Sequence, residues 1–255
     1  MGLKNVRQLQ GKVAIVTGAA GGFGEGIAKL FVAEGARVLI VDIDGAKAQK
    51  VATELGASAK AQQCDVSKGA DVHAAVKACM DAFGPPDIVV NNAGTTHRNQ
   101  PMLDVDEATF DRVFNVNVKS IYHMAQAVVP IMRARRQGVI INIGSTAGIR
   151  PRPGLTWYNA SKGAVNLLSK SMAAELGPDN IRVNAICPVM GATGLIEQFL
   201  GMPDTPENRA KIVAGIPLGR MSTPEDIAGA ALYLASDAGQ FITGVELPVD
   251  GGRTI

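Results

Sequence analysis

Residues 13–24 decide the fold of this chain and read Val13-Ala14-Ile15-Val16-Thr17-Gly18-Ala19-Ala20-Gly21-Gly22-Phe23-Gly24. A short β-branched run followed at once by glycines predicts a buried strand that ends in a tight turn. A helical pattern over residues 23–34 begins directly after the turn. A helix N-terminus in this position binds a pyrophosphate, because backbone N–H groups and the helix dipole both favour the anion. The stretch therefore predicts a dinucleotide site, although its spacing is T-G-x-x-x-G-x-G rather than the commoner G-x-G-x-x-G.

A carboxylate follows at the distance that such a site requires. Asp42 closes the second apolar run eighteen residues after Gly24, close to the ~20 expected for a group that binds the adenosine ribose. A carboxylate there repels a 2′-phosphate, and the turn contains no lysine or arginine to attract one, so NAD is favoured over NADP. Asp44 competes for this role, but its position favours capping of the next helix.

The rest of the chain alternates short apolar runs with helical patterns. Strands are predicted at 13–16, 38–41, 88–90, 139–143, 181–186 and 245–249, and helices at 23–34, 45–55, 70–83, 110–134 and 158–176. This alternation predicts a doubly wound α/β fold of the Rossmann type, with about seven parallel strands and helices on both faces. With no repeat, low-complexity stretch or linker, residues 1–255 are expected to form a single domain.

Composition excludes several classes of function. Of the 255 residues, 47% are hydrophobic and 19% charged, and the net charge is only +2, which is typical of a compact globule. Arg133, Arg135 and Arg136 form the densest basic cluster, which we interpret as the complement of a helix C-terminus rather than as a nucleic-acid site. No apolar run is long enough to span a membrane, no secretory leader is evident, and the three scattered cysteines favour a reducing compartment. A soluble cytoplasmic protein without a bound metal is expected.

Tyr158 and Lys162 stand four residues apart, and Ser145 lies thirteen residues upstream of the tyrosine. On a helix this spacing places the phenol and the ammonium on one face. The ammonium favours the phenolate, so the pKa of Tyr158 is predicted to fall below its usual value of about 10. Such a tyrosine can exchange a proton with an alcohol or ketone oxygen. The pair alone also arises by chance on solvated helices, and the dinucleotide site is what favours the catalytic interpretation.

Taken together, these motifs resemble those of the short-chain dehydrogenase/reductase family over nearly the whole chain. The resemblance also rests on 65–66, 91–94, 115–120, 184–188, 241–244 and 249–252. It implies a catalytic set of Asn117, Ser145, Tyr158 and Lys162. The cofactor contacts that it implies are Gly18, Gly22, Phe23, Gly24, Asp42, Ile43, Asp65, Val66, Asn92, Ala93, Gly94, Tyr158, Lys162, Pro188, Gly191 and Thr193.

The resemblance implies roles for the catalytic set. Tyr158 is the general acid or base, and Ser145 donates a hydrogen bond to the substrate oxygen. Lys162 also binds the nicotinamide ribose, and Asn117 positions a water that links the lysine to solvent. Relatives are commonly homotetramers. Val189 stands where the family usually has glycine, and because valine resists positive φ the conformation of that loop stays open.

The substrate is not identified by the sequence. Its walls are expected at 95–98, 147–157 and 189–216, the last a substrate loop whose apolar residues suit either a mobile lid or an ordinary surface helix. Arg98, Arg150 and Arg152 suit either a substrate anion or solvent. The leading hypothesis is an NAD-dependent dehydrogenase of a secondary alcohol, small, cyclic or polyol-like. The alternatives are a 3-oxoacyl-thioester reductase and, remotely, a non-catalytic nucleotide-binding scaffold.

Overall fold

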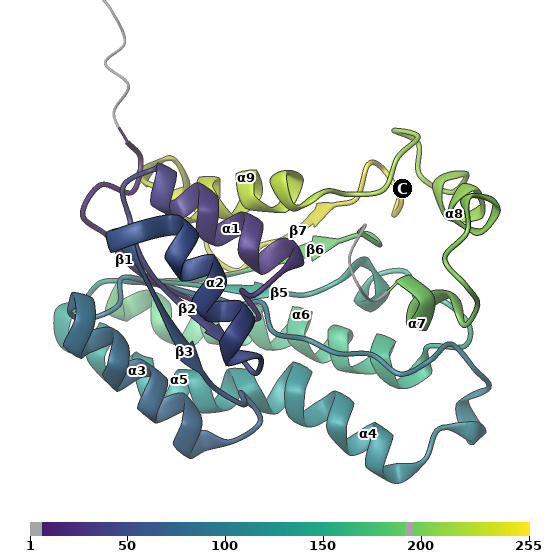
Figure 1. The fold of residues 1–255 in the computed structure, drawn as a ribbon, viewed down its shortest axis with the longest axis horizontal. Coiled ribbons are helices and arrows are strands. Elements are labelled where there is room, and N and C mark those ends of the chain that lie inside the picture. The colour runs from purple at the N-terminus through teal and green to yellow at the C-terminus, as the bar shows by residue number, and fades with distance from the viewer. Residues whose placement is uncertain (1–6, 192–195) are drawn as a thin grey trace, which may run out of the picture.

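A computed structural model describes residues 7–191 and 196–255, and its centre is one parallel sheet. The strand order is β3-β2-β1-β4-β5-β6-β7, and every neighbouring pair is parallel. The predicted doubly wound fold is thereby confirmed (Figure 1). The strands are β1 (Val13–Thr17), β2 (Arg37–Asp42), β3 (Ala59–Gln63), β4 (Ile88–Asn91), β5 (Gly138–Ile143), β6 (Ile181–Pro188) and β7 (Glu246–Val249).

Helices cover both faces of the sheet (Figure 1). One layer contains α1 (Gly22–Ala33), α2 (Gly45–Leu55) and α9 (Pro224–Ala235), which share a core cluster. The opposite layer contains α3 (Gly69–Phe83), α5 (Ser120–Arg135) and α6 (Thr156–Leu176), with α4 (Glu107–Phe114) leading into α5. Two short helices, α7 (Ile196–Leu200) and α8 (Pro206–Val213), lie beyond the end of the sheet (Figure 1).

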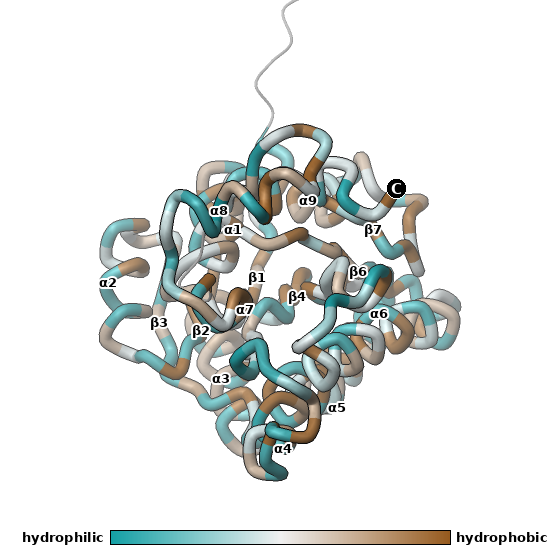
Figure 2. Tube along the Cα trace, turned by 90° about the vertical axis from the view of Figure 1, so that its right-hand side faces the viewer, coloured by the Kyte–Doolittle hydropathy of each residue, from teal (hydrophilic) through white to brown (hydrophobic). Residues whose placement is uncertain are grey.

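The first strand shows why the apolar runs are continuous rather than alternating. Ala14 and Val16 belong to the core beneath α1 and α9, whereas Val13 and Ile15 belong to the core beneath α3 and α5. Successive side chains of a strand point to opposite faces, so a strand covered on both faces must be apolar throughout. In Figure 2 the apolar strands β1 and β4 accordingly lie between the two helix layers.

Three elements differ from the sequence prediction. The edge strand β3 was not predicted, because its sequence Ala-Lys-Ala-Gln-Gln is mostly polar and only partly buried. Helix α9 was also missed, although Thr223 caps it and a proline opens it. The helix predicted over 110–134 begins at Glu107 and is interrupted by a π-helical turn at Asn115–Lys119. No helix in the described part of the chain is long and apolar enough to cross a bilayer.

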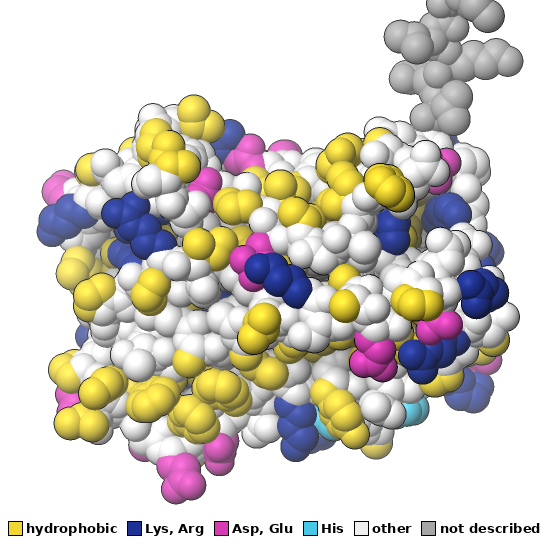
Figure 3. Space-filling model, turned by 180° about the vertical axis from the view of Figure 1, so that it is seen from behind, with side chains coloured by type: hydrophobic (Ala, Val, Ile, Leu, Met, Phe, Trp, Pro, Cys, Tyr) yellow, Lys and Arg dark blue, Asp and Glu magenta, His cyan; other side chains and the backbone are white. Residues whose placement is uncertain are grey.

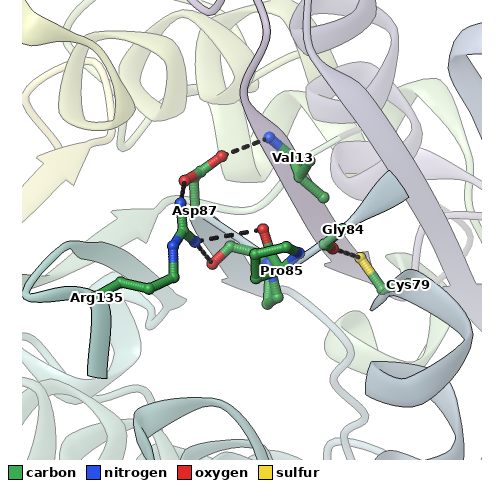
Figure 4. A network of polar contacts seen from close by, with 7 residues as sticks. Val13, Cys79, Gly84, Pro85, Asp87 and Arg135 are labelled. Atoms are coloured by element: carbon green, nitrogen blue, oxygen red, sulfur yellow. Dashed lines mark hydrogen bonds and ion pairs between the residues drawn. The ribbon is translucent and has the colours of Figure 1, made fainter. Parts of the chain in front are cut away.

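A partly buried ion pair joins three elements at the amino end of the central strands (Figure 4). The Asp87 carboxylate accepts a hydrogen bond from the Val13 backbone N–H at 2.9 Å and from the Arg135 guanidinium at 2.7 Å. Arg135 also donates to the carbonyl oxygens of Pro85 and Pro86. This arginine therefore binds a specific carboxylate, which is a narrower role than the predicted complement of the helix dipole.

Candidate active site

A cavity of about 740 Å³ lies at the carboxyl ends of the strands, where ligands bind in open α/β sheets. Its lining comes from the loops after β1, β2, β3, β4, β5 and β6, and also from α4, α6, α7, α8 and the C-terminal turn. Most of the residues predicted from the sequence line it: Gly18, Gly22, Phe23, Asp42, Ile43, Asp65, Val66, Asn92, Ala93, Gly94, Ser145, Tyr158, Lys162, Pro188 and Gly191.

Two positions of the glycine-rich turn, Gly18 and Gly24, leave no room for a side chain. Gly18 has a φ of +62°, and a Cβ on it would lie 2.8 Å from the Ala93 Cα. A Cβ on Gly24 would lie 2.3 Å from the Gly18 carbonyl oxygen, so Gly24 supports the turn from behind without lining the cavity. Helix α1 begins after Gly21, which has no side chain to cap the first N–H groups. These donors are available to an anion.

Asp42 sits at the end of β2 with its carboxylate fixed on both sides. One oxygen accepts from the Ala20 N–H and the other from the Asp44 N–H, each at 3.0 Å. Asp44 instead caps α2 by accepting from the Lys47 N–H at 3.0 Å. The predicted helix cap is therefore confirmed for Asp44, and the ribose contact of Asp42 stays a prediction. Ile43, 66% exposed, forms the adjacent rim of the cavity.

The loop after β4 is bonded directly to the glycine-rich turn. The Thr17 hydroxyl accepts from the backbone N–H groups of Asn92 and Ala93, both at 3.0 Å. The Asn92 side-chain amide donates at 2.9 Å to the carbonyl oxygens of Thr17 and Gly18. Two segments about 75 residues apart therefore form one rigid floor for the cavity.

Ser145, Tyr158 and Lys162 come together on the other side of that floor. Ser145 follows β5, and the other two residues lie in the first turns of α6. All three are buried, with exposed fractions of 8%, 7% and 5%. The Lys162 ammonium donates at 2.7 Å to the carbonyl oxygen of Ile143, at the end of β5. The edge of the Phe199 ring packs against the Tyr158 ring at a centroid distance of 5.0 Å.

The predicted fall in the pKa of Tyr158 is wrong for the protein alone. Burial raises the pKa of Tyr158 to about 12, and the hydrogen bond with Ser145 only partly opposes this rise. Burial also lowers the pKa of Lys162 to about 8. The lysine directs its ammonium at the Ile143 carbonyl, so desolvation outweighs the charge effect that the i,i+4 spacing suggests.

Asn117 lies in the π-helical turn between α4 and α5, a feature that often marks functional sites. Its side-chain amide donates to the Thr95 carbonyl at 2.9 Å and to the Ser161 hydroxyl at 3.0 Å. Its amide oxygen accepts from the Thr95 N–H at 2.8 Å. Asn117 does not line the cavity itself, but it joins the loop after β4 to α6, one residue before Lys162.

The loop after β6 has a different conformation from the one that the family glycine suggests. Val189 is buried with Ile212 and Ile216, and among the described residues only Arg136 and Asn180 have a positive φ without being glycine. Valine is therefore compatible with this backbone. Gly191 packs against Phe23, since a Cβ there would lie 2.3 Å from the ring. Thr193, like Leu195 of the predicted substrate loop, falls outside the described residues.

The substrate walls are located where the sequence predicts them, but several lining residues were missed. Thr95, residues of 147–157 and residues of 189–216 border the cavity. Arg98 does not, and instead donates to the Gly201 carbonyl. Sequence reasoning missed Arg112, Arg253 and Thr254, which share no motif.

Comparison with known proteins gives a consistent answer. A family model described as enoyl-(acyl carrier protein) reductase matches residues 18–254. The chain is 50% identical to 4-formylbenzenesulfonate dehydrogenase TsaC1/TsaC2 of Comamonas testosteroni, over 97% of this chain and 99% of that protein. It is 40% identical to galactitol 2-dehydrogenase of Agrobacterium fabrum, over 96% and 98%.

A solved structure is equally similar. The 3-ketoacyl-(acyl-carrier-protein) reductase of Brucella melitensis, complexed with NADH, is 47% identical to this chain and superposes with a TM-score of 0.92. The match covers 97% of this chain and all of the Brucella chain. The matches span both the glycine-rich turn and the Ser145, Tyr158 and Lys162 set, and the chain belongs to the short-chain dehydrogenase/reductase family.

Proposed function

We propose that the protein is an NAD(H)-dependent oxidoreductase that interconverts a secondary alcohol and its ketone. The observation that carries this proposal is a single cavity lined by the glycine-rich turn, Asp42 and the Ser145, Tyr158 and Lys162 side chains. Binding of a dinucleotide and exchange of a proton with an oxygen are thus available at one site. The remote alternative, a non-catalytic scaffold, gives no reason for a buried lysine and a buried tyrosine beside the nucleotide floor.

Each residue of the set has a distinct role in the proposed reaction. A bound nicotinamide supplies the hydride donor for reduction and the acceptor for oxidation. Tyr158 gives its phenolic proton to the substrate oxygen during reduction and removes that proton during oxidation. Ser145 donates a hydrogen bond to the same oxygen while charge develops on it. Lys162 orients the ribose and resupplies the proton, and Asn117 holds the loop and helix that border the lysine.

The cofactor preference is assigned to Asp42, and this assignment gives the direct test of the proposed function. Wild-type protein should bind NADH more tightly than NADPH, because the fixed carboxylate repels a 2′-phosphate. In the Asp42→Ala variant the preference should narrow by about tenfold, which corresponds to roughly 1.4 kcal/mol. Parallel fluorescence titrations with NADH and NADPH measure this preference in the wild-type protein and in the variant. An unchanged ratio would assign the selection to another residue, and binding of neither would refute the proposed function.

The pH dependence follows from the pKa of Tyr158. Oxidation needs the phenolate, and burial raises that pKa to about 12, so kcat/KM for oxidation should rise from about pH 6 to about pH 10. Reduction needs the protonated phenol and should lose rate only at the alkaline end. Steady-state profiles in both directions provide the measurement. A flat profile for oxidation would exclude Tyr158 as the base.

A 3-oxoacyl-thioester reductase is the second candidate, favoured by the similarity to the Brucella reductase. The cofactor alone does not separate the two functions, since that reductase is itself complexed with NADH. The substrate end of the cavity separates them better. Besides Lys162, five cationic side chains line the cavity outside its acidic end, and a compact substrate that reaches them is the simpler occupant. We therefore retain the alcohol dehydrogenase as the leading function.

We also propose that the protein is a cytoplasmic homotetramer. Exposed apolar side chains on α5 and α6, Tyr122 and Leu167, are 58% and 65% exposed. A further group near the end of the chain includes Phe241, which is fully exposed. Figure 3 shows hydrophobic side chains gathered over the lower part of the rear face. Burial of such surface between subunits is favourable, and the mass measured by light scattering tests the assembly.

A further inference from the structure

Apart from Lys47, which forms an ion pair with Asp44 at 2.9 Å, charges of opposite sign are segregated within the cavity. Its carboxylates, Asp42, Asp44 and Asp65, all follow β2 and β3 at one edge of the sheet. On the side of β5, β6 and β7 no carboxylate of the described chain lines the cavity, which instead carries a set of cations. They are Arg112, Arg150, Arg152, Lys211 and Arg253. The acidic end corresponds to the adenosine, and the cationic end lies beyond Tyr158, where the substrate belongs.

Three of these arginines form a cluster held by backbone contacts. The Arg150 N–H donates to the Thr146 carbonyl at 2.7 Å, and the Asn159 amide donates to the Arg152 carbonyl at 2.8 Å. The Arg150 guanidinium donates to the Arg253 carbonyl at 3.0 Å, which joins the segment before α6 to the C-terminal turn. The cluster therefore stands on ordered backbone that continues into the helix turn of Tyr158.

None of the three forms an ion pair with an Asp or Glu side chain of the described chain, whereas four other arginines do, and Arg150 also donates to the Ile255 oxygen at 3.4 Å. Arg133, Arg135, Arg209 and Arg220 each form an ion pair. Within residues 7–191 and 196–255, Arg152 and Arg253 form none, and the residues outside those ranges include no Asp or Glu. Asp250 is the nearest acid in sequence to Arg253, and both of its carboxylate oxygens accept hydrogen bonds from Gly252 and Thr254.

The arrangement is electrostatically unfavourable without an anion. Arg152 is half-buried, and both this burial and the charge of Arg253 lower its pKa. Two neighbouring guanidinium groups that are partly desolvated and unpaired repel each other, whereas a shared oxyanion satisfies both through charge-assisted hydrogen bonds. The apolar side chains of Leu155 and Phe199 line the cavity with Tyr158 and suit an apolar substrate body.

We infer that Arg152 and Arg253, with Arg150 beside them, form a subsite for an oxyanion carried by the substrate. The inference rests on the proposed function and narrows it. The substrate has an alcohol or ketone carbon at Tyr158, an apolar body against Leu155 and Phe199, and a carboxylate, sulfonate or phosphate at the arginines. A purely neutral alcohol would leave this end of the cavity without a role.

The test measures binding rather than turnover, so it does not depend on catalysis. Calorimetry compares benzenesulfonate, benzoate and phenyl phosphate with uncharged methyl phenyl sulfone, using the protein alone and the protein with NADH. The best anion should bind about 10- to 100-fold more tightly than the sulfone. The ligand that binds most tightly identifies the preferred oxyanion as a sulfonate, a carboxylate or a phosphate. The advantage should shrink as salt is added, because the interaction is ionic.

Variants connect that affinity to the cluster. Arg152→Gln with Arg253→Gln should abolish the anion advantage, and Arg152→Lys, which keeps the charge, should restore part of it. The control is Arg7→Gln, an exposed arginine before β1 at the opposite end of the sheet, which should bind as the wild type does. Circular dichroism checks that each variant is folded.

Two outcomes would overturn the subsite. One is that the wild-type protein binds the anionic ligands no more tightly than the sulfone, or binds neither. The other is an anion advantage that persists in the folded double variant. Failure of the proposed function is distinguishable from both, since it would appear as loss of NADH binding or of turnover while the anion advantage in the protein alone remained.

Discussion

Replacing Tyr158 with phenylalanine is expected to lower turnover by about 10²- to 10⁴-fold, the range that removal of a general acid or base produces. The ring remains, so its edge-to-face contact with Phe199 is kept, and NADH should bind nearly as tightly as before. The loss should fall on kcat rather than on cofactor affinity, because only the proton carrier has been removed. Stopped-flow turnover combined with an NADH titration separates the two quantities.

The matched control is Tyr233→Phe, which makes the same chemical change at a tyrosine of α9 that is 45% exposed. It should leave both turnover and NADH affinity unchanged. Full activity of the Tyr158→Phe protein would remove this residue from the mechanism. Equal loss in both variants would indicate a general effect of the substitution on the assembly.

The second large effect is expected from Gly24→Ala. Its Cβ would lie 2.3 Å from the Gly18 carbonyl oxygen and 2.5 Å from the Asn92 amide. The asparagine side chain can rotate, but the carbonyl belongs to the backbone of the nucleotide turn, so the turn itself must shift. Overpacking of this kind costs about 1–3 kcal/mol, and the cofactor affinity should fall by at least about tenfold.

Gly229→Ala provides the control for this change. Gly229 also lies inside a helix, α9, but a Cβ there meets nothing within 4 Å. Because glycine weakens a helix relative to alanine by about 0.5–1 kcal/mol, this variant should melt at the same or a higher temperature and bind NADH normally. Thermal unfolding and NADH titration of both variants are the measurements. Normal NADH binding by Gly24→Ala would show that the turn tolerates displacement.

The fold was largely predictable because its signal is local and strong. The runs that became β1, β2 and β4 are apolar throughout and those of β5 and β6 are mostly apolar, as burial on both faces demands. Strand β3 gave no such signal because it is an edge strand whose residues are only partly buried. The π-helical turn at Asn117 was equally hidden, since it depends on bonds from the asparagine to Thr95 and Ser161, which are distant in sequence.

The candidate site, like the fold, was predictable where its signal lies in contiguous motifs and not where it depends on distant contacts. The glycine-rich turn and Asp42 are contiguous motifs, and the structure brings both to the cavity. The pKa of Tyr158 could not be predicted from its spacing to Lys162, because burial dominates and burial is a property of the whole fold. Arg253 is joined to Arg150 across 103 residues. Only the folded chain shows that these charges are neighbours.

The ion pair of Asp87 and Arg135 has a practical consequence for redesign of this enzyme. It fastens β1, β4 and α5 together at the base of the sheet, whereas every loop that lines the cavity emerges from the top. A mutant library confined to the upper loops would therefore leave this fastening untouched, and most of its members should still fold. Directed evolution of the upper loops should therefore be able to select new substrate preferences while the base of the sheet keeps its structure.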